Sequence, residues 1–214
     1  MRQRGLVLVA LAASLLWPSP ALAGRPAVCL LTFTDARPVK SPASVPYRVK
    51  AENTPKPLRA HPREGPAEVR RMVLRALKAE RGIEVIDLGE EADLQHLADD
   101  PNFNRCSIVV GGAVFHYEGT VAVDIYGTKF FTGLVGFELV AADARRGRST
   151  FPPVAFAGRR QSEPVKADDD FGTNDRQNFK EWVGEALKTA SASLPARFVR
   201  PAVAAARRGA PPTK

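Results

Sequence analysis

Residues 106–118, CSIVVGGAVFHYE, constrain the fold of this chain more than any other stretch. The run combines β-branched residues with the aromatic Phe115 and Tyr117, a composition typical of a β-strand. Its paired Gly111 and Gly112 mark a bulge, or a place where a bulky side chain or another backbone comes close. We therefore expect this run to be the organising strand of one sheet, with the rest of the chain packed on it or paired to it.

The first 23 residues have the pattern of a secretory signal peptide with cleavage after Ala23. Arg2 and Arg4 form a basic start, residues 6–17 are an apolar run, and small residues precede the cleavage point. A membrane anchor is the alternative, but a helix of this length spans about 18 Å, less than the ~30 Å hydrocarbon core of a bilayer. We expect a protein that is exported to the periplasm or secreted.

The chain has two cysteines, Cys29 and Cys106. In an exported protein such a pair predicts one disulfide. Each cysteine opens a predicted strand, so the thiols come within reach if those strands are parallel neighbours. Closing a loop of this length would contribute up to about 4 kcal/mol through chain entropy; two free buried thiols are the alternative. Residues 25–28 do not form a lipidation box, and the sequence does not decide whether Cys29 is ever lipidated.

Apolar patterns predict five strands and two main helices. The strands are expected at residues 27–34, 83–88, 106–118, 133–144 and 149–160. The helices are expected at residues 66–81 and between a polar loop at 168–175 and Leu194, with a weaker helical turn at 91–98. Right-handed crossovers followed by hairpins give a five-stranded mixed sheet of order 2-1-3-4-5. The predicted fold is therefore an α/β (α+β) sandwich, with residues 120–131 as a long hairpin arm or loop.

The mature chain is long enough for a single domain, which we place at residues 24–199. Residues 38–62 are rich in proline and show no helical or strand period, so we expect a mobile loop that either binds a partner or is a poorly ordered insertion. Residues 200–214 are expected to be a disordered basic tail. The formal charge of the whole chain is +8. We interpret the excess as solvated, with anionic lipid or cell-wall polymer, rather than nucleic acid, as the alternative target.

The sequence contains no motif for catalysis, metal binding or cofactor binding. There is no HExxH, GxSxG, P-loop or GxGxxG pattern, and the three histidines lie far apart: His61, His96 and His116. We therefore predict no catalytic residues, no metal and no cofactor. One alternative is a hydrolase of cell-wall or polysaccharide substrates that uses Glu118, Asp124 or Glu138 as paired carboxylates. Another is a small-molecule carrier, which would need a closed apolar pocket between sheet and helices.

Two stretches are candidates for contact with a partner. Tyr47 lies in the proline-rich loop, and Phe130 and Phe131 lie beside Gly127 and Gly133 at the expected hairpin. Exposed aromatic side chains mark partner surfaces, so the hairpin predicts an exposed aromatic tip. Packing of the two phenylalanines in the core is the alternative.

The order of these elements resembles the small bacterial envelope proteins of the YajG type, which are related in fold to LpoB and to the periplasmic domain of CsgG. The likeness is carried by a buried strand ending in Asp35-Ala36-Arg37-Pro38, the strand GGAVFHYEG, a later strand ending in DARRGR, and a closing helix. The resemblance implies a non-enzymatic role by protein contact in envelope assembly, secretion or transport. It supplies no site residues, and this chain departs from the many lipoprotein members because no lipidation box precedes Cys29.

Overall fold

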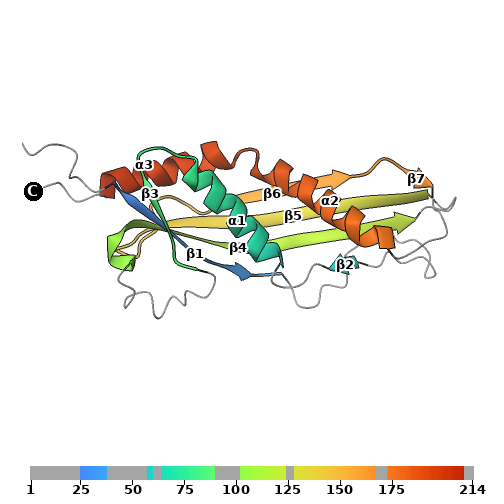
Figure 1. Cartoon of the computed structure of the whole chain (residues 1–214), viewed down its shortest axis with the longest axis horizontal. Helices are drawn as coiled ribbons and strands as arrows, with labels where there is room; N and C mark the ends of the chain where they lie inside the picture. Colours follow the sequence, from blue (N-terminus) through green and yellow to red (C-terminus); the bar gives the residue numbers. More distant parts are fainter. Residues whose placement is uncertain are drawn as a thin grey trace, which may run out of the picture.

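A mixed β-sheet with helices on one side forms the body of the protein (Figure 1). The computed structural model describes residues 25–37, 57–59, 64–89, 102–123, 128–166 and 173–209. The strands are β1 (Ala27–Asp35), β2 (Pro57–Arg59), β3 (Glu84–Asp87), β4 (Cys106–Val123), β5 (Thr128–Asp143), β6 (Val154–Gln161) and β7 (Val165–Lys166). The helices are α1 (Glu64–Lys78), α2 (Thr173–Ser191) and α3 (Arg200–Gly209), with a 3-10 turn η4 (Phe103–Arg105) and a π-helical turn η5 (Pro195–Val199).

The sheet is built outward from β4. This strand pairs in parallel with β1 on one edge and in antiparallel fashion with β5 on the other. β3 extends the sheet beyond β1, and β6 extends it beyond β5. The order β3-β1-β4-β5-β6 confirms the predicted order 2-1-3-4-5 and the predicted α/β sandwich. Two short strands lie off this path, β2 paired with β4 and β7 paired with β5.

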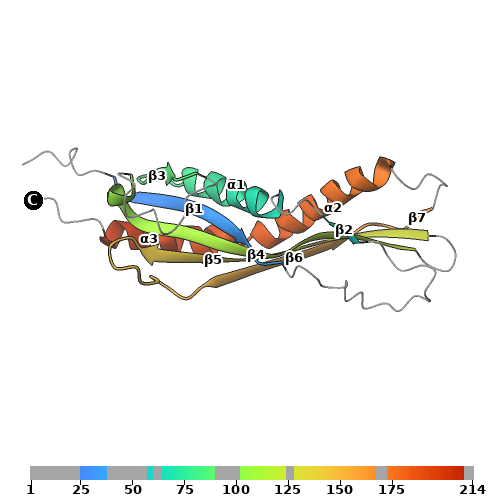
Figure 2. The same ribbon diagram turned by 90° about the horizontal axis from the view of Figure 1, so that it is seen from below.

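The β4–β5 hairpin is longer than the sequence pattern predicted. β4 continues to Val123 and β5 begins at Thr128, so the segment expected to be a hairpin arm or loop is strand wherever it is described. β2 and β7 pair with this arm at Thr120 and again at Thr128. Figure 2 shows the arm running well past the end of β1.

The three helices pack on one face of the sheet, as Figure 1 shows from the helix side. A single buried hydrophobic cluster lies between the sheet and the helices. The strands contribute Val28, Leu30, Val110, Val114, Val135, Phe137 and Leu139 to it. The helices contribute Val69, Val73, Leu77, Val183, Ala186, Phe198, Ala202 and Val203. Removing this much apolar surface from water is the main force that holds the helices to the sheet. The predicted first helix is confirmed as α1, and Gly82 follows it with φ +82°, the left-handed conformation expected after a helix end.

Two glycines allow α2 to lie directly on the sheet. A Cβ atom on Gly133 of β5 would lie 2.1 Å from the carbonyl oxygen of Trp182, and a Cβ on Gly158 of β6 would lie 2.0 Å from that of Ala186. No side chain fits at either distance, because the atoms in the way belong to the helix backbone. The sheet therefore carries glycine at the two places where α2 crosses it most closely.

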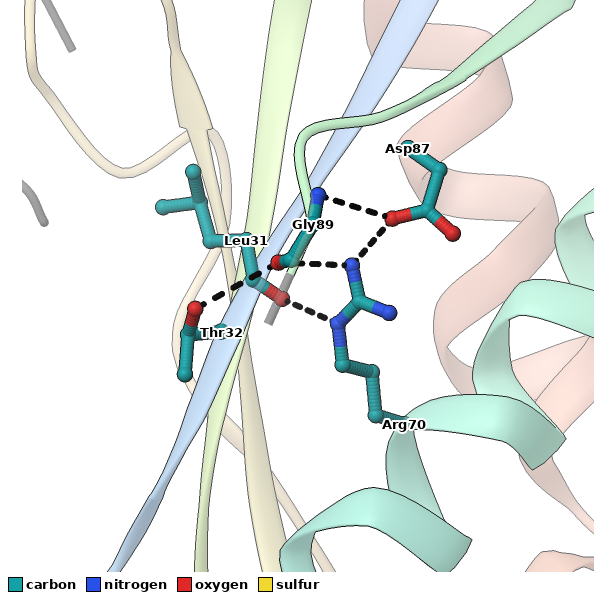
Figure 3. A network of polar contacts seen from close by, with 5 residues as sticks. All are labelled: Leu31, Thr32, Arg70, Asp87 and Gly89. Atoms are coloured by element: carbon teal, nitrogen blue, oxygen red, sulfur yellow. Dashed lines mark hydrogen bonds and ion pairs between the residues drawn. The ribbon is translucent and has the colours of Figure 1, made fainter. Parts of the chain in front are cut away.

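Arg70 fixes α1 to the middle of β1 and to the end of β3 (Figure 3). Its side chain is almost fully buried, and its Nε donates to the carbonyl oxygen of Leu31 at 3.0 Å. Its Nη2 donates to the carbonyl oxygen of Gly89 at 3.0 Å and to the Asp87 carboxylate. Burial opposes ionisation of Asp87, but the hydrogen bonds from Arg70 and from the Gly89 N–H outweigh it and hold the pKa of Asp87 below its usual value. A buried guanidinium with all these acceptors is stable where an unpaired one would not be.

A disulfide joins Cys29 of β1 to Cys106 of β4, as the sequence predicted, with the two Cα atoms 5.7 Å apart. The parallel pairing of β1 and β4 brings the two cysteines together. Cys29 is completely buried. In the oxidised folded protein its sulfur is therefore not available to carry a lipid.

The prediction of a disordered tail at 200–214 is wrong for residues 200–209, which form α3. Four small apolar residues of this helix are buried: Ala202, Val203, Ala205 and Ala206. Their helical spacing and the high helix propensity of alanine outweigh the prolines and arginines that indicated disorder. The π-helical turn at Pro195 carries the chain onward from α2, so the helical region does not end at Leu194.

The proline-rich segment 38–62 is likewise not wholly a loop, because residues 57–59 form β2. The remaining residues of that segment, the signal peptide, the turn predicted at 91–98 and residues 210–214 lie outside the described residues. None of the helices in the described ranges is both long enough and apolar enough to cross a membrane.

We expect the Cys29→Ala/Cys106→Ala double variant to lose about 2–4 kcal/mol of unfolding free energy, because the bridge restricts the unfolded chain. Denaturant titration of parent and variant measures the loss. Reducing the parent with dithiothreitol is the control and should shift its midpoint to that of the variant. A parent whose two thiols react freely before reduction would contradict the bridge.

Gly158→Ala should destabilise the protein by at least about 2 kcal/mol, because the new methyl group cannot avoid the α2 backbone. Gly184→Ala, in α2 itself, is the matched control, since a Cβ there meets no atom within 4 Å. That change should leave stability unaltered or raise it by up to about 1 kcal/mol through helix propensity. Equal denaturation midpoints for the two variants would show that α2 does not lie on β6 as described.

Candidate functional site

The face of the sheet opposite the helices is the candidate functional surface, which we call the open face. Side chains alternate along a strand, so the residues between the core positions point to this side. They include Phe115, His116 and Glu118 on β4, Leu134, Gly136, Glu138 and Val140 on β5, and Ala155, Ala157 and Arg159 on β6. The three described helices all lie on the other side of the sheet (Figure 2).

Phe115 stands on a β-bulge within the open face. The register of β4 and β5 shifts between Val114 and His116, so Phe115 has no partner on β5. Val114 and Tyr117 stay buried in the core on either side of it. Phe115 is 39% exposed, and among the described side chains it is the large hydrophobic one that faces solvent. A bulge re-aims a side chain, and an exposed aromatic ring is a group that a partner can bury.

His116 lies beside Phe115 and reaches across β5. A Cβ on Gly136 would lie 3.0 Å from the Cδ2 atom of the ring, so the imidazole rests where β5 has no side chain. The Nδ1 atom of His116 is 3.3 Å from Oε1 of Glu118. The next strand places Ala157 opposite Gly136. The centre of the open face is thus an aromatic pair above small residues, with a carboxylate at its border.

The carboxylates of the hydrolase alternative are not brought together. Glu118 lies opposite Leu134 and Glu138 opposite Ala113, so the two positions are four residues apart along β5. At about 3.4 Å per residue their backbones are about 14 Å apart, so the strand pairing alone does not bring the carboxyl groups to the separation of roughly 5–10 Å found in glycosidases. Asp124 lies outside the described residues. This placement gives the hydrolase alternative no support.

No group of three or more side chains suited to metal binding occurs within the described ranges. Of the histidines, His116 is described, while His61 and His96 lie outside the described residues.

The predicted aromatic tip is only partly where the sequence placed it. Phe131 is 5% exposed and therefore buried, which is the core alternative, while Phe130 is half-buried on the open side of β5. Consecutive strand residues point to opposite faces, so the two rings cannot form one exposed tip. Tyr47 lies outside the described residues. Sequence reasoning missed Phe115, because only the register shift in the pairing with β5 shows that its ring turns outward.

A polar network fixes the point where β1 leaves the sheet, next to the bulge. The Arg37 guanidinium binds the Asp35 carboxylate through two hydrogen bonds, with Nη2 to Oδ2 at 2.6 Å and Nε to Oδ1 at 2.7 Å. The same guanidinium donates to the carbonyl oxygen of Tyr117 at 3.5 Å. Its hydrogen bonds hold the pKa of Asp35 below its usual value against a smaller opposing effect of burial. The segment Asp35-Ala36-Arg37 thus fixes the end of β1 to β4.

Tyr117 lies on the core side of the bulge, beneath the first turn of α1. A Cβ on Gly65 would lie 2.9 Å from its Cβ atom, which shows how closely the helix approaches. Burial, and then the nearby Glu68 and Glu64 carboxylates, raise the pKa of Tyr117 to about 12. The ring is therefore neutral over the whole physiological range and packs in the core between the sheet and α1.

Neither a family model nor a curated protein sequence matches this chain. Its fold is similar to solved bacterial structures. Protein XCC0632 from Xanthomonas campestris, of family DUF330, is 12% identical, with 89% of this chain and 92% of that chain covered at a TM-score of 0.44. The PelC dodecamer from Paraburkholderia phytofirmans is 15% identical (83% and 93% covered, TM-score 0.39). Lipoprotein GNA1162 from Neisseria meningitidis is 13% identical (64% and 85% covered, TM-score 0.36). At these TM-scores the likenesses carry no conclusion about function.

Tyr117 should ionise about two pH units later than an exposed tyrosine, because burial and the α1 carboxylates favour its neutral form. Between pH 10.0 and about 12 the folded protein keeps the Tyr117 proton and the unfolded chain does not. The free energy of unfolding should therefore be highest below pH 10 and fall as the pH rises towards 12. A spectrophotometric titration of tyrosinate absorbance measures the transition. In the Tyr117→Phe control that late transition should be missing, while the ionisation of the other tyrosines is unchanged. A parent titration with every tyrosine ionising near pH 10 would contradict the buried position.

Proposed function

We propose that this chain is an exported, non-enzymatic protein of the bacterial cell envelope that acts by binding a partner protein through the open face. The observation that carries the proposal is Phe115, a large apolar side chain that a bulge turns outward on a sheet face without a described helix. Leaving such a ring in water is unfavourable, and burying it against a partner removes that cost.

Two features support an exported protein. The first 23 residues have the charge, apolar run and small-residue end of a signal peptide, whose cleavage remains a prediction. The disulfide between Cys29 and Cys106 fits an oxidising compartment, since cytosolic thiols are kept reduced. The resemblance to YajG-type proteins points in the same direction and adds the finer role in envelope assembly, secretion or transport.

The open face has the composition of a contact surface with an apolar centre and a polar rim. Phe115 and Leu134 supply the apolar part, and small residues on β5 and β6 let a partner approach the backbone closely. Glu118, Glu138 and Arg159 supply charges around them. Aromatic residues at the centre of such patches contribute most of the binding energy, while rim charges contribute mainly to specificity. The partner we expect has an apolar pocket for Phe115 and polar groups around it.

Site-specific photo-cross-linking in living cells tests the proposal. The photoreactive amino acid benzoylphenylalanine is placed at position 115 on the open face, or at Arg75, an exposed position on α1, as the matched control. We expect a discrete cross-linked adduct from position 115 and none from position 75. The same adduct should form from position 134 and should disappear when Phe115→Asp is added.

Folding of every variant is checked by disulfide formation and circular dichroism before the adducts are compared. Adducts that form equally from positions 75 and 115, or an adduct from position 134 that survives Phe115→Asp, would show that the open face is not the contact surface.

A further inference from the structure

A second surface lies at the end of the molecule where both ends of the described chain meet, and we call it the basic pole. Ala27, at the start of β1, pairs with both Glu84 and Cys106. Near the start of β4, Ile108 pairs with Asp143, the last residue of β5. The start of β1, the end of α1, η4 and the turn after β5 therefore share this end, and α3 finishes beside them at the left of Figure 1.

The ends of α1 and α3 supply four exposed basic side chains to the pole. They are Lys78 in the last turn of α1, Arg81 just after it, and Arg207 and Arg208 in the last turn of α3. The Arg207 guanidinium donates to the carbonyl oxygen of Arg81 at 3.0 Å, so the two helix ends are in contact. The helix dipole alone favours cations at helix C-termini. It would explain these four side chains if the pole held no other basic residues.

The other side of the pole adds cations that no helix dipole explains. The turn between β5 and β6 exposes Arg145, Arg146 and Arg148, and none of the three guanidinium groups has an ion pair within the described residues. The Asp143 carboxylate accepts the backbone N–H groups of Arg145 and Arg146, at 2.9 and 3.0 Å, so it orders the turn.

Arg105 of η4 is the one cation of the pole that is paired with a carboxylate in the described residues, with its Nη2 2.5 Å from Oε1 of Glu84. Including Arg25, which precedes β1, nine basic side chains of the described residues lie at this end. The carboxylates of the same segments are Glu80, Glu84 and Asp143. The excess of positive charge at the pole is thus drawn from separate segments of the chain that only the fold brings together.

We propose that the basic pole binds an anionic lipid bilayer surface. Attraction to such a surface depends on the number of cations that reach it rather than on one fixed geometry, which fits cations spread over helix ends, a turn and a strand start. The position of the leader favours a membrane over other polyanions. The predicted apolar run ends at Trp17, eight residue steps before Arg25. Until the leader is cleaved after Ala23, a linker of this length can hold the pole no farther than about 28 Å from the membrane that contains the apolar run.

Vesicle flotation tests the proposal with the exported, disulfide-bonded protein. The probes are vesicles of phosphatidylcholine alone and vesicles that also contain phosphatidylglycerol. The parent should bind only the anionic vesicles, and binding should weaken strongly between about 0.05 and 0.5 M NaCl, as the Debye length shortens. The variant Arg145→Glu/Arg146→Glu/Arg208→Glu should bind at least ~50-fold more weakly, since each basic residue near an anionic surface contributes roughly 5-fold.

Two further variants identify the cause of any loss. Arg71→Glu/Arg160→Glu/Lys180→Glu makes the same change in net charge at exposed positions away from the pole and off the open face. This control should bind less than about 5-fold more weakly than the parent. Arg145→Lys/Arg146→Lys/Arg208→Lys keeps the charge and should bind like the parent. Circular dichroism and denaturation midpoints confirm that all variants fold.

Several outcomes would overturn the proposal. They are binding to neutral vesicles as strong as to anionic ones, equal losses from the two charge-reversal variants, and failure of the lysine variant to bind. Binding to anionic cell-wall polymer but not to anionic vesicles would assign the pole to a different ligand. Binding to anionic vesicles only after the five carboxylates of residues 90–101 are neutralised would also overturn the proposal, because the parent protein would then not bind such a surface. The result does not depend on the open face, so a failure here leaves the cross-linking prediction untouched.

Discussion

Pairing of β4 on both of its edges is the constraint on which the rest of the structure depends. One edge holds β1 in parallel and the other holds β5 in antiparallel fashion, so β4 joins the crossover half of the fold to the hairpin half. The disulfide fixes the first of these pairings covalently at Cys29 and Cys106. The bulge at Phe115 lies where β1 ends. The N–H of Ala36, the residue after β1, donates to the carbonyl oxygen of Val114 at 2.9 Å, and Phe115 is the next residue of β4. The same strand thus supplies the framework, the covalent bridge and the exposed ring.

The described helices cover one face of the sheet, and the proposed contact uses the other face. On the helix side, glycines at 133 and 158 bring the α2 backbone against β5 and β6, and Arg70 fixes α1 to the middle of β1 and to the end of β3. On the open side, Phe115 and His116 lie above Gly136 without a described helix over them. One rigid layer of helices can therefore hold the sheet in shape while its opposite face is presented to a partner.

Much of the fold was predictable because it rests on local periodicity and on chain rules. Strand patterns, the stripe of α1 and right-handed crossovers were enough for the sheet order and the disulfide. The site was less predictable, because a bulge depends on the register between two strands and changes which side of the sheet a residue faces. That is why Phe115 was read as an ordinary strand residue and is exposed, while for Phe131 the sequence left an exposed tip and core packing both open, and the ring is buried. Helix α3 was missed because its stripe consists of alanines, which bury little surface each but pack closely.

Contact through the open face is tested most directly by hydroxyl-radical footprinting, read by mass spectrometry, of the purified protein and of the same protein in intact envelopes. In the purified protein Phe115 and His116 should be oxidised rapidly, while the fully buried Phe137 and Phe198 stay unmodified. In the envelope the oxidation of Phe115 and His116 should fall several-fold, whereas that of Met72 on the helix side should not change. Equal oxidation of Phe115 in both samples would contradict a function by contact through this face.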